Sequence, residues 1–203
     1  MRIYLNNMIL CLDLSYSNTG YSLFYENGKF KCSGSITPPK KSTNLKAMLY
    51  IYNNVVLLFN KYGITQVVIE DVYVGRNKKV VISLSRLSGS ILGLSMLKLK
   101  RVPVLISAVK ARSDIGIDGS SKKPYIQLHI LELFKMVKYS IIKKYRKDLD
   151  RLTATYCNEK VSKSQYTYRL SKISKEIAKT TGLNNDEADS IVLGLAYIKK
   201  REV

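Results

Sequence analysis

Met8-Ile9-Leu10-Cys11-Leu12-Asp13-Leu14 is the stretch that decides the fold, because this short apolar run is typical of a buried strand and contains one carboxylate. Two segments of alternating polarity follow it, residues 21–26 and 29–36. Between them stands Asn27-Gly28, the residue pair most typical of a tight hairpin turn. The chain is therefore predicted to open with three strands, of which the second and third form a hairpin.

Helical and strand patterns alternate further along the chain. From Asn44, which we expect to cap a helix, apolar residues recur at helical spacing as far as Gly63. Residues 66–70 form a β-branched run typical of a buried parallel strand, residues 80–99 predict an apolar helix, and residues 102–106 predict a fifth strand. The core order βββαβαβα predicts an α/β fold with a mixed sheet flanked by helices.

The remaining sequence is strongly basic. Residues 110–123 are expected to form a basic loop, and Pro124 stands where the next helix would begin. Residues 138–180 have apolar residues at loose helical spacing, so we expect a basic helical insertion in a single domain that spans residues 1–203. Asn184 and Asn185 can cap a final helix that runs to about Lys200.

Charge and composition limit the classes of protein that fit. The 203 residues include 34 Lys and Arg against 15 Asp and Glu, a formal net charge of +19, so nucleic acid is the expected partner. The hydrophobic fraction of 46% excludes a disordered tail protein. Residues 80–99 contain Arg86 and Lys98, which favours a buried helix over a membrane span. Three widely spaced Cys, one His and no secretory signal lead us to expect a cytoplasmic protein that is not secreted.

Four of the few acidic residues stand where they could share a site. Asp13 and Glu70 end two strands, whereas Asp186 and Asp189 share one face of the final helix. Simpler roles remain open, since Asp13 can cap the turn after its strand and an acidic first turn complements a helix dipole. If the four cluster, their repulsion requires a divalent cation, and oxygen ligands without His or Cys select Mg²⁺ or Mn²⁺. Two such ions would support hydrolysis of a phosphodiester.

Three motifs resemble those of a known family. Asp13-Leu14-Ser15-Tyr16-Ser17-Asn18-Thr19-Gly20-Tyr21 resembles the first-strand motif of the RuvC branch of the RNase H-like nucleases. Val67-Val68-Ile69-Glu70 resembles the strand that carries the family's second acidic residue, and Asp186-Glu187-Ala188-Asp189 resembles its last two metal ligands. The long Lys-rich chain looks most like the poxvirus Holliday junction resolvases. The resemblance implies an RNase H-like fold and a Mg²⁺-dependent endonuclease that cuts four-way DNA junctions by paired symmetric nicks.

The resemblance also implies roles for residues around these carboxylates. Tyr73 stands where such resolvases carry an aromatic that stacks at the centre of the junction. The two family lysines beside the scissile phosphate correspond to Lys110 and to Lys123, with Lys122 as the alternative to Lys123. The implied DNA-binding residues are Tyr73, Arg76, Lys78, Lys79 and Lys122. For a viral protein, the expected work is the processing of branched or concatemeric viral DNA in the host cytoplasm.

The apolar helix carries two glycines four residues apart, Gly89 and Gly93. They either allow close packing on the sheet or let two helices approach each other across a dimer interface. The corresponding helix contributes to dimerisation in RuvC-like enzymes, so the resemblance implies a homodimer.

Two other functions stay open at this stage. A non-catalytic basic DNA-packaging protein would explain the charge but would leave Asp13 and Glu70 without a role. Another RNase H-like nuclease would cut the RNA of RNA/DNA hybrids instead of branched DNA.

Overall fold

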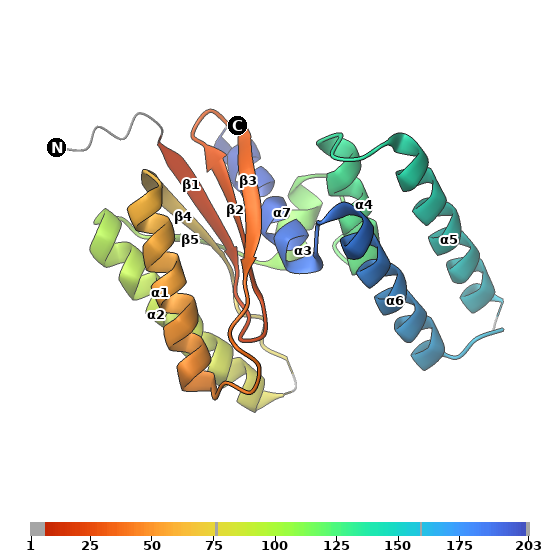
Figure 1. Cartoon of the computed structure of the whole chain (residues 1–203), viewed down its shortest axis with the longest axis horizontal. Coiled ribbons are helices and arrows are strands. Elements are labelled where there is room, and N and C mark those ends of the chain that lie inside the picture. Colours follow the sequence, from red (N-terminus) through yellow and green to blue (C-terminus); the bar gives the residue numbers. More distant parts are fainter. Residues whose placement is uncertain (1–6, 76, 159, 202–203) are drawn as a thin grey trace. The chain divides into compact units, whose positions relative to one another are not determined.

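The computed structural model of the chain describes residues 7–75, 77–158 and 160–201. These residues form two compact units (Figure 1). The first unit runs up to Gly119 and resumes at Asp189, and the second is Ser120–Ala188.

The first unit is built on a mixed sheet of five strands in the order β3-β2-β1-β4-β5. The strands are β1 (Met8–Asp13), β2 (Thr19–Tyr25), β3 (Phe30–Ile36), β4 (Ile64–Glu70) and β5 (Val104–Ile106). Strand β1 pairs antiparallel with β2 and parallel with β4, and β4 pairs parallel with β5. The β2–β3 hairpin turns at Gly28, whose φ of +84° favours glycine. The predicted mixed sheet with its opening hairpin is therefore confirmed.

Helices cover both faces of this sheet. Helices α1 (Asn44–Lys61) and α2 (Lys78–Leu99) lie on one face, and α7 (Asn185–Arg201) lies, from Asp189 onward, on the other (Figure 1). On the α7 side, the Ser22 hydroxyl donates to the Ser190 carbonyl at 2.8 Å. A Cβ on Gly194 would stand only 2.1 Å from the Phe24 ring, so glycine allows α7 to lie directly against β2.

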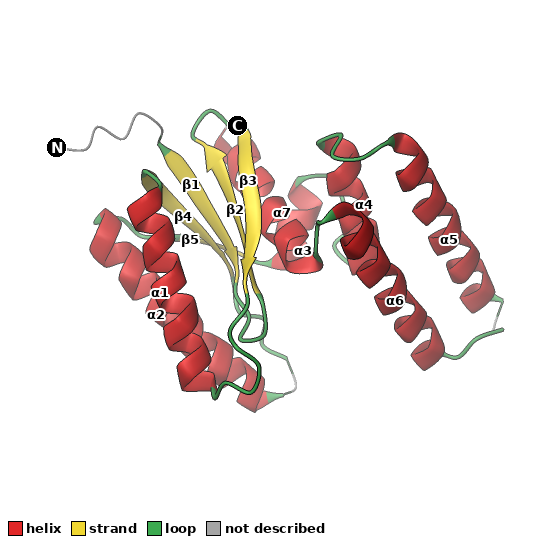
Figure 2. Cartoon of the chain, viewed as in Figure 1, coloured by secondary structure: helices red, strands yellow, loops and turns green. Residues whose placement is uncertain are grey.

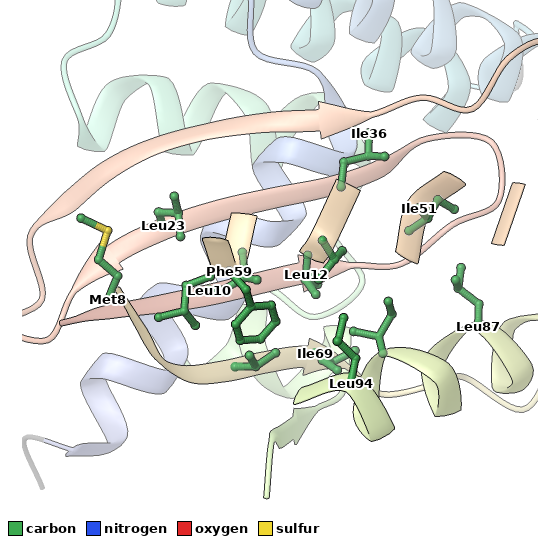
Figure 3. Packing of buried hydrophobic residues seen from close by; sticks show 14 residues of the cluster. Met8, Leu10, Leu12, Leu23, Ile36, Ile51, Phe59, Ile69, Leu87 and Leu94 are labelled. Carbon is green, nitrogen blue, oxygen red and sulfur yellow. The ribbon is translucent and has the colours of Figure 1, made fainter. Parts of the chain in front are cut away.

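The main core lies between the sheet and the pair α1 and α2 (Figure 3). Leu10 and Leu12 of β1 and Ile69 of β4 have no exposed surface and pack in this layer. The helices contribute apolar side chains that include Ile51, Val55, Phe59, Leu87, Ile91 and Leu94. Because side chains alternate along a strand, the residues that follow Leu12 and Ile69 point to the opposite face of the sheet.

Helix α2 is not the buried helix that its composition suggested. Its length and apolar composition would let it cross a membrane, yet only 28% of its most apolar window is buried. Leu87 packs on the sheet, whereas Leu97 is 65% exposed. In the described part of the chain, nothing lies within 4 Å of a Cβ built on Gly89 or Gly93. The alternative that the two glycines serve close packing on the sheet is therefore wrong.

Two local expectations also need correction. Helix α1 is capped by Thr43, whose side chain accepts from the Lys46 N–H, whereas the Asn44 side chain donates to the Ser83 hydroxyl. The expected loop at residues 110–123 overlaps a short helix, α3 (Ala108–Asp114). Ser107 caps this helix by accepting from the Lys110 N–H.

The second unit is helical (Figure 2). Helix α4 (Lys123–Leu133) has Pro124 in its first turn, as predicted. The basic residues 138–180 form α5 (Tyr139–Cys157) and nearly all of α6 (Lys163–Thr181). A buried Gln127 side chain donates to the Leu183 carbonyl at 2.9 Å and accepts from the Ser174 hydroxyl at 2.7 Å, which ties α4 to α6.

Candidate active site

Asp13 and Glu70 are the last residues of two adjacent parallel strands, β1 and β4. Their preceding residues, Leu12 and Ile69, are direct partners in the ladder. Because the Leu12 and Ile69 side chains point into the core, the carboxylates that follow them point to the α7 side of the sheet. Both are half-buried. This register agrees with the expectation that Asp13 and Glu70 meet at one edge of the sheet.

A cavity of about 330 Å³ opens at this edge, and Asp13 and Glu70 are among the residues that line it. Its other walls include Asp71 and Tyr73 of the loop after β4 and the first turns of α2. Asn77 begins α2 there by accepting from the Val80 N–H. The cavity is therefore open to a ligand and has acidic and apolar walls.

Asp189 lies on the same side of the sheet, in α7. The carbonyl of its neighbour Ser190 accepts a hydrogen bond from the Ser22 hydroxyl. Ser22 is the ladder partner of Cys11, whose side chain points to the same face of the sheet as that of Asp13. Asp189 is 7% exposed, and its Oδ1 lies 3.1 Å from a terminal nitrogen of Arg112. Loss of either partner of such a buried pair destabilises the fold, because it leaves a buried charge without compensation.

Arg112 is the site residue that sequence reasoning missed. It lies on α3, and it also donates to the Gly119 carbonyl at 3.3 Å. Among the residues that the structure describes, its buried Nε has no hydrogen-bond partner. The signal that could have revealed this helix is Ser107, a preferred capping residue directly after a strand.

Lys110, predicted to stand beside the scissile phosphate, lies on the same short helix. Its ammonium group pairs with Asp114 one turn later, and its side chain remains 58% exposed. Lys200 of α7 approaches the second oxygen of Asp114 at 3.8 Å. Lys110 is therefore held at the surface of the first unit, with its charge partly balanced.

The second unit contains the other predicted catalytic residues. Lys123 is the first residue of α4, and its Nζ lies 3.7 Å from Asp186 Oδ1. Lys122 caps the same helix and is exposed. Lys123, which is predicted to stand beside the scissile phosphate, therefore lies next to Asp186, a predicted metal ligand of the same unit.

Of the predicted DNA-binding residues, Tyr73 is 84% exposed in the loop after β4. Lys78 and Lys79 begin α2 and are also exposed. Arg76 lies outside the described residues. These positions allow contact with a nucleic acid.

Cys11 takes no part in metal binding or nucleophilic chemistry, although it points to the same face as Asp13. It is fully buried, and burial raises the pKa of its thiol to about 12. The thiolate, which is the reactive form, is therefore scarce at neutral pH.

The donor atoms of this site suit a hard divalent cation. Asp13 and Glu70 bring carboxylate oxygens, the ligands that Mg²⁺ and Mn²⁺ prefer, to one edge of the sheet. Within residues 7–75, 77–158 and 160–201, no group of three or more His, Cys, Asp or Glu side chains is placed to hold a metal ion. The set of four ligands that includes Asp186 and Asp189 therefore remains a prediction.

Comparison with known proteins agrees with this fold. A family model described as Crossover junction endodeoxyribonuclease RuvC matches residues 9–141, a range that includes both strand-end carboxylates. Thermus thermophilus RuvC is similar in structure, with a TM-score of 0.62, 10% identity, and coverage of 96% of this chain and 95% of that chain. T. thermophilus RuvC in complex with a Holliday junction substrate gives a TM-score of 0.56 at 8% identity, over 96% and 94% of the two chains. No curated protein matches the sequence.

Proposed function

The chain belongs to the RuvC family of crossover junction endodeoxyribonucleases, and from this premise we propose that it resolves four-way DNA junctions by paired symmetric nicks. It is a metal-dependent endodeoxyribonuclease. The observation that carries the proposal is the placement of Asp13 and Glu70 at the ends of adjacent parallel strands around one open cavity.

In this proposal, Asp13, Glu70, Asp186 and Asp189 hold Mg²⁺, with two ions in each site. When bound, Mg²⁺ makes water a nucleophile at neutral pH and stabilises the oxygen that leaves the phosphodiester. The carboxylates orient the attacking water by accepting its hydrogen bonds. Lys110 and Lys123 place positive charge near the scissile phosphate, which neutralises charge that develops in the transition state.

The choice of branched DNA rests on exposed aromatic and basic residues. Tyr73 presents an exposed ring beside Glu70 and can stack on a base that is unpaired at the crossover. Lys78, Lys79 and Lys122 are exposed and can contact phosphates, and Arg76 completes the predicted basic loop. A base at a junction centre offers a free face that regular duplex DNA lacks.

The proposed working unit is a homodimer that pairs through α2. Its outer side has Ile82 51% exposed and Leu97 65% exposed, and Gly89 and Gly93 lie between them with open space around their backbone. A two-fold dimer matches the two-fold symmetry of a four-way junction and supplies one active site for each strand that is cut.

The biological setting that we propose is viral. It rests on the resemblance of the long Lys-rich chain to the poxvirus resolvases, and it would place the enzyme on branched or concatemeric DNA in the host cytoplasm.

The deciding experiment incubates the protein with an end-labelled four-way junction, a linear duplex and an RNA/DNA hybrid, each with and without Mg²⁺. Mg²⁺-dependent paired cuts in the junction, with little cutting of the other two, would support the proposal. Preferred cutting of the hybrid would assign the protein to the other branch of RNase H-like enzymes. Binding of all three without any cutting would identify a DNA-packaging protein instead.

A further inference from the structure

We propose that a groove between α5 and α6 binds the sugar-phosphate backbone of a DNA arm, as a contact separate from the active site. The proposal rests on the proposed function, because it assumes that DNA is the substrate. Most of α5 and all of α6 lie beyond the range that the family model matches, residues 9–141. All the residues that line the groove therefore lie outside the matched range.

The groove is formed by one face of each helix. Residues 148, 151, 152 and 155 line it from α5, and residues 169, 172, 173 and 176 line it from α6. Both sets have the spacing i, i+3, i+4 and i+7, which places their side chains along one stripe of a helix. The cavity between the two stripes measures about 480 Å³.

Charge is separated along the length of this groove. The Tyr145 hydroxyl lies 2.8 Å from the Thr180 hydroxyl, and the Tyr156 and Tyr166 rings stack at 4.4 Å between centroids. The two helices are therefore antiparallel, and their register places Asp148 opposite Glu176 at one end. The basic residues Arg151, Arg169 and Lys172 line the other end, together with Thr155.

No carboxylate in the part of the chain that the structure describes lies within ion-pair distance of the cations at the basic end. Among the described residues, the ion pairs within the second unit are Lys123 with Asp186 and Arg146 with Glu132. Neither pair includes Arg151, Arg169 or Lys172, and all three side chains are exposed. Three cations along a concave surface attract a polyanion, because binding one releases its condensed counterions.

DNA backbone suits this end better than a compact anion. The cations come from both helices, and the two on α6, Arg169 and Lys172, lie about one helical turn apart. This spacing matches a run of phosphates more closely than a single phosphate. Leu152 and Ile173 form the apolar floor against which the sugars can pack. Asp148 and Glu176 repel phosphate at the opposite end, so the groove admits a backbone at its basic end only.

The test compares two triple variants with the same change in net charge. Arg151→Gln/Arg169→Gln/Lys172→Gln removes the groove cations but keeps their aliphatic stems. The control Lys143→Gln/Lys163→Gln/Lys175→Gln removes exposed cations of the same two helices that do not line the groove. Binding to a four-way junction and to a linear duplex is measured without divalent metal, so that no cleavage occurs.

We expect the groove variant to bind both DNAs at least roughly tenfold more weakly than the wild type at physiological salt. The slope of log K against log salt should shrink by about 0.9 for each phosphate contact that is lost. The control should change both quantities much less. Equal losses in the two variants, or no loss in either, would overturn the proposal.

A second measurement uses the wild-type protein and so does not depend on how a variant folds. Bound junction should protect Lys172 from chemical acetylation while leaving Lys163 reactive. Equal protection of the two lysines would contradict a groove contact. If the wild type binds DNA but does not cut junctions, the proposed function fails and the groove can stand. If it cuts junctions and Lys172 stays unprotected, only the groove proposal fails.

Discussion

The guanidinium group of Arg112 lies 3.1 Å from the carboxylate of Asp189, and both side chains are largely buried. The pair joins α3 to α7 across 77 positions of sequence. Asp189 is also a predicted metal ligand, so Arg112 supplies, in the metal-free protein, part of the positive charge that a cation would bring. We therefore expect the state of this pair and the binding of Mg²⁺ to be coupled.

Replacing Arg112 with Ala should lower the free energy of unfolding by about 3 kcal/mol, because it leaves a buried carboxylate without a charged partner. Mg²⁺ should restore more stability to this variant than it adds to the wild type. Thermal unfolding with and without Mg²⁺ measures both effects. Arg112→Lys keeps the charge and should lie between the two. An identical response to Mg²⁺ in all three proteins would show that Arg112 and the metal are independent.

Asp13→Asn, Glu70→Gln and Asp189→Asn should each abolish junction cleavage while leaving junction affinity within a few-fold of wild type. Each change removes a metal ligand, whereas binding depends mainly on Lys and Arg contacts with phosphate. Asp71→Asn is the matched control, since Asp71 lines the same cavity but is not a predicted ligand. Single-turnover cleavage and a gel-shift titration separate the two quantities. Normal cleavage by any of the three variants would remove that residue from the metal site.

Tyr73→Ala should reduce the preference for junction over duplex more than it reduces affinity for duplex. Stacking on an exposed base contributes about 1 to 3 kcal/mol, and an intact duplex offers no such base. Competition binding with the two DNAs gives the ratio directly. Tyr139→Ala, at another exposed tyrosine, should leave the ratio unchanged. Equal weakening on both DNAs would mean that Tyr73 does not recognise the crossover.

Gly93→Glu should convert a dimer to a monomer without loss of stability. Among the described residues, nothing lies within 4 Å of a Cβ built on Gly93, so the new side chain has room in its own subunit and puts a charge on the proposed dimer face. Light scattering gives the mass, and thermal unfolding checks the fold. Asn53→Glu on α1 serves as control. A wild type that is already monomeric while it resolves junctions would contradict the dimer.

His129 should make the second unit less stable as the pH falls. Burial lowers the pKa of His129 below its ordinary value of 6.5, so the unfolded chain binds the proton more readily than the folded one. Stability is therefore highest above pH 6.5, declines as the pH drops from 6.5 toward the lower folded pKa, and levels off below that pKa. Urea unfolding of the wild type and of His129→Gln at several pH values measures the contribution of His129 to the free energy of unfolding. A wild type that becomes more stable than the variant below pH 6.5 would contradict the expected sign.

Sequence patterns were sufficient where a single local rule decides the outcome. The apolar run that ends at Asp13 and the β-branched run that ends at Glu70 predicted two buried strands with carboxylates at their ends. The parallel pairing of β1 and β4 brings those ends together, because the carboxyl ends of parallel strands share one edge of a sheet. The hairpin at Gly28 followed equally well from the chemistry of its turn.

Other features depend on contacts that no local pattern contains. Helix α3 has 7 residues, too few to show a helical period, and so its Arg112 was not expected near Asp189. Composition made α2 look buried, but burial depends on which elements cover a helix, and here its outer side is left open. The separation of charge along the α5–α6 groove depends on the register of two helices, which the basic composition of residues 138–180 does not specify.

The pairing of β1 with β4 bears on how this protein can diverge. Main-chain hydrogen bonds, which every residue except proline can form, set the spacing between the ends of these strands. Apolar side chains beneath them can be exchanged for others of similar volume at small cost. Mutations can thus accumulate through most of the sheet while Asp13 and Glu70 stay side by side. A fold shared at 10% identity is the outcome expected when the backbone, and not the identity of its side chains, is what selection has to preserve.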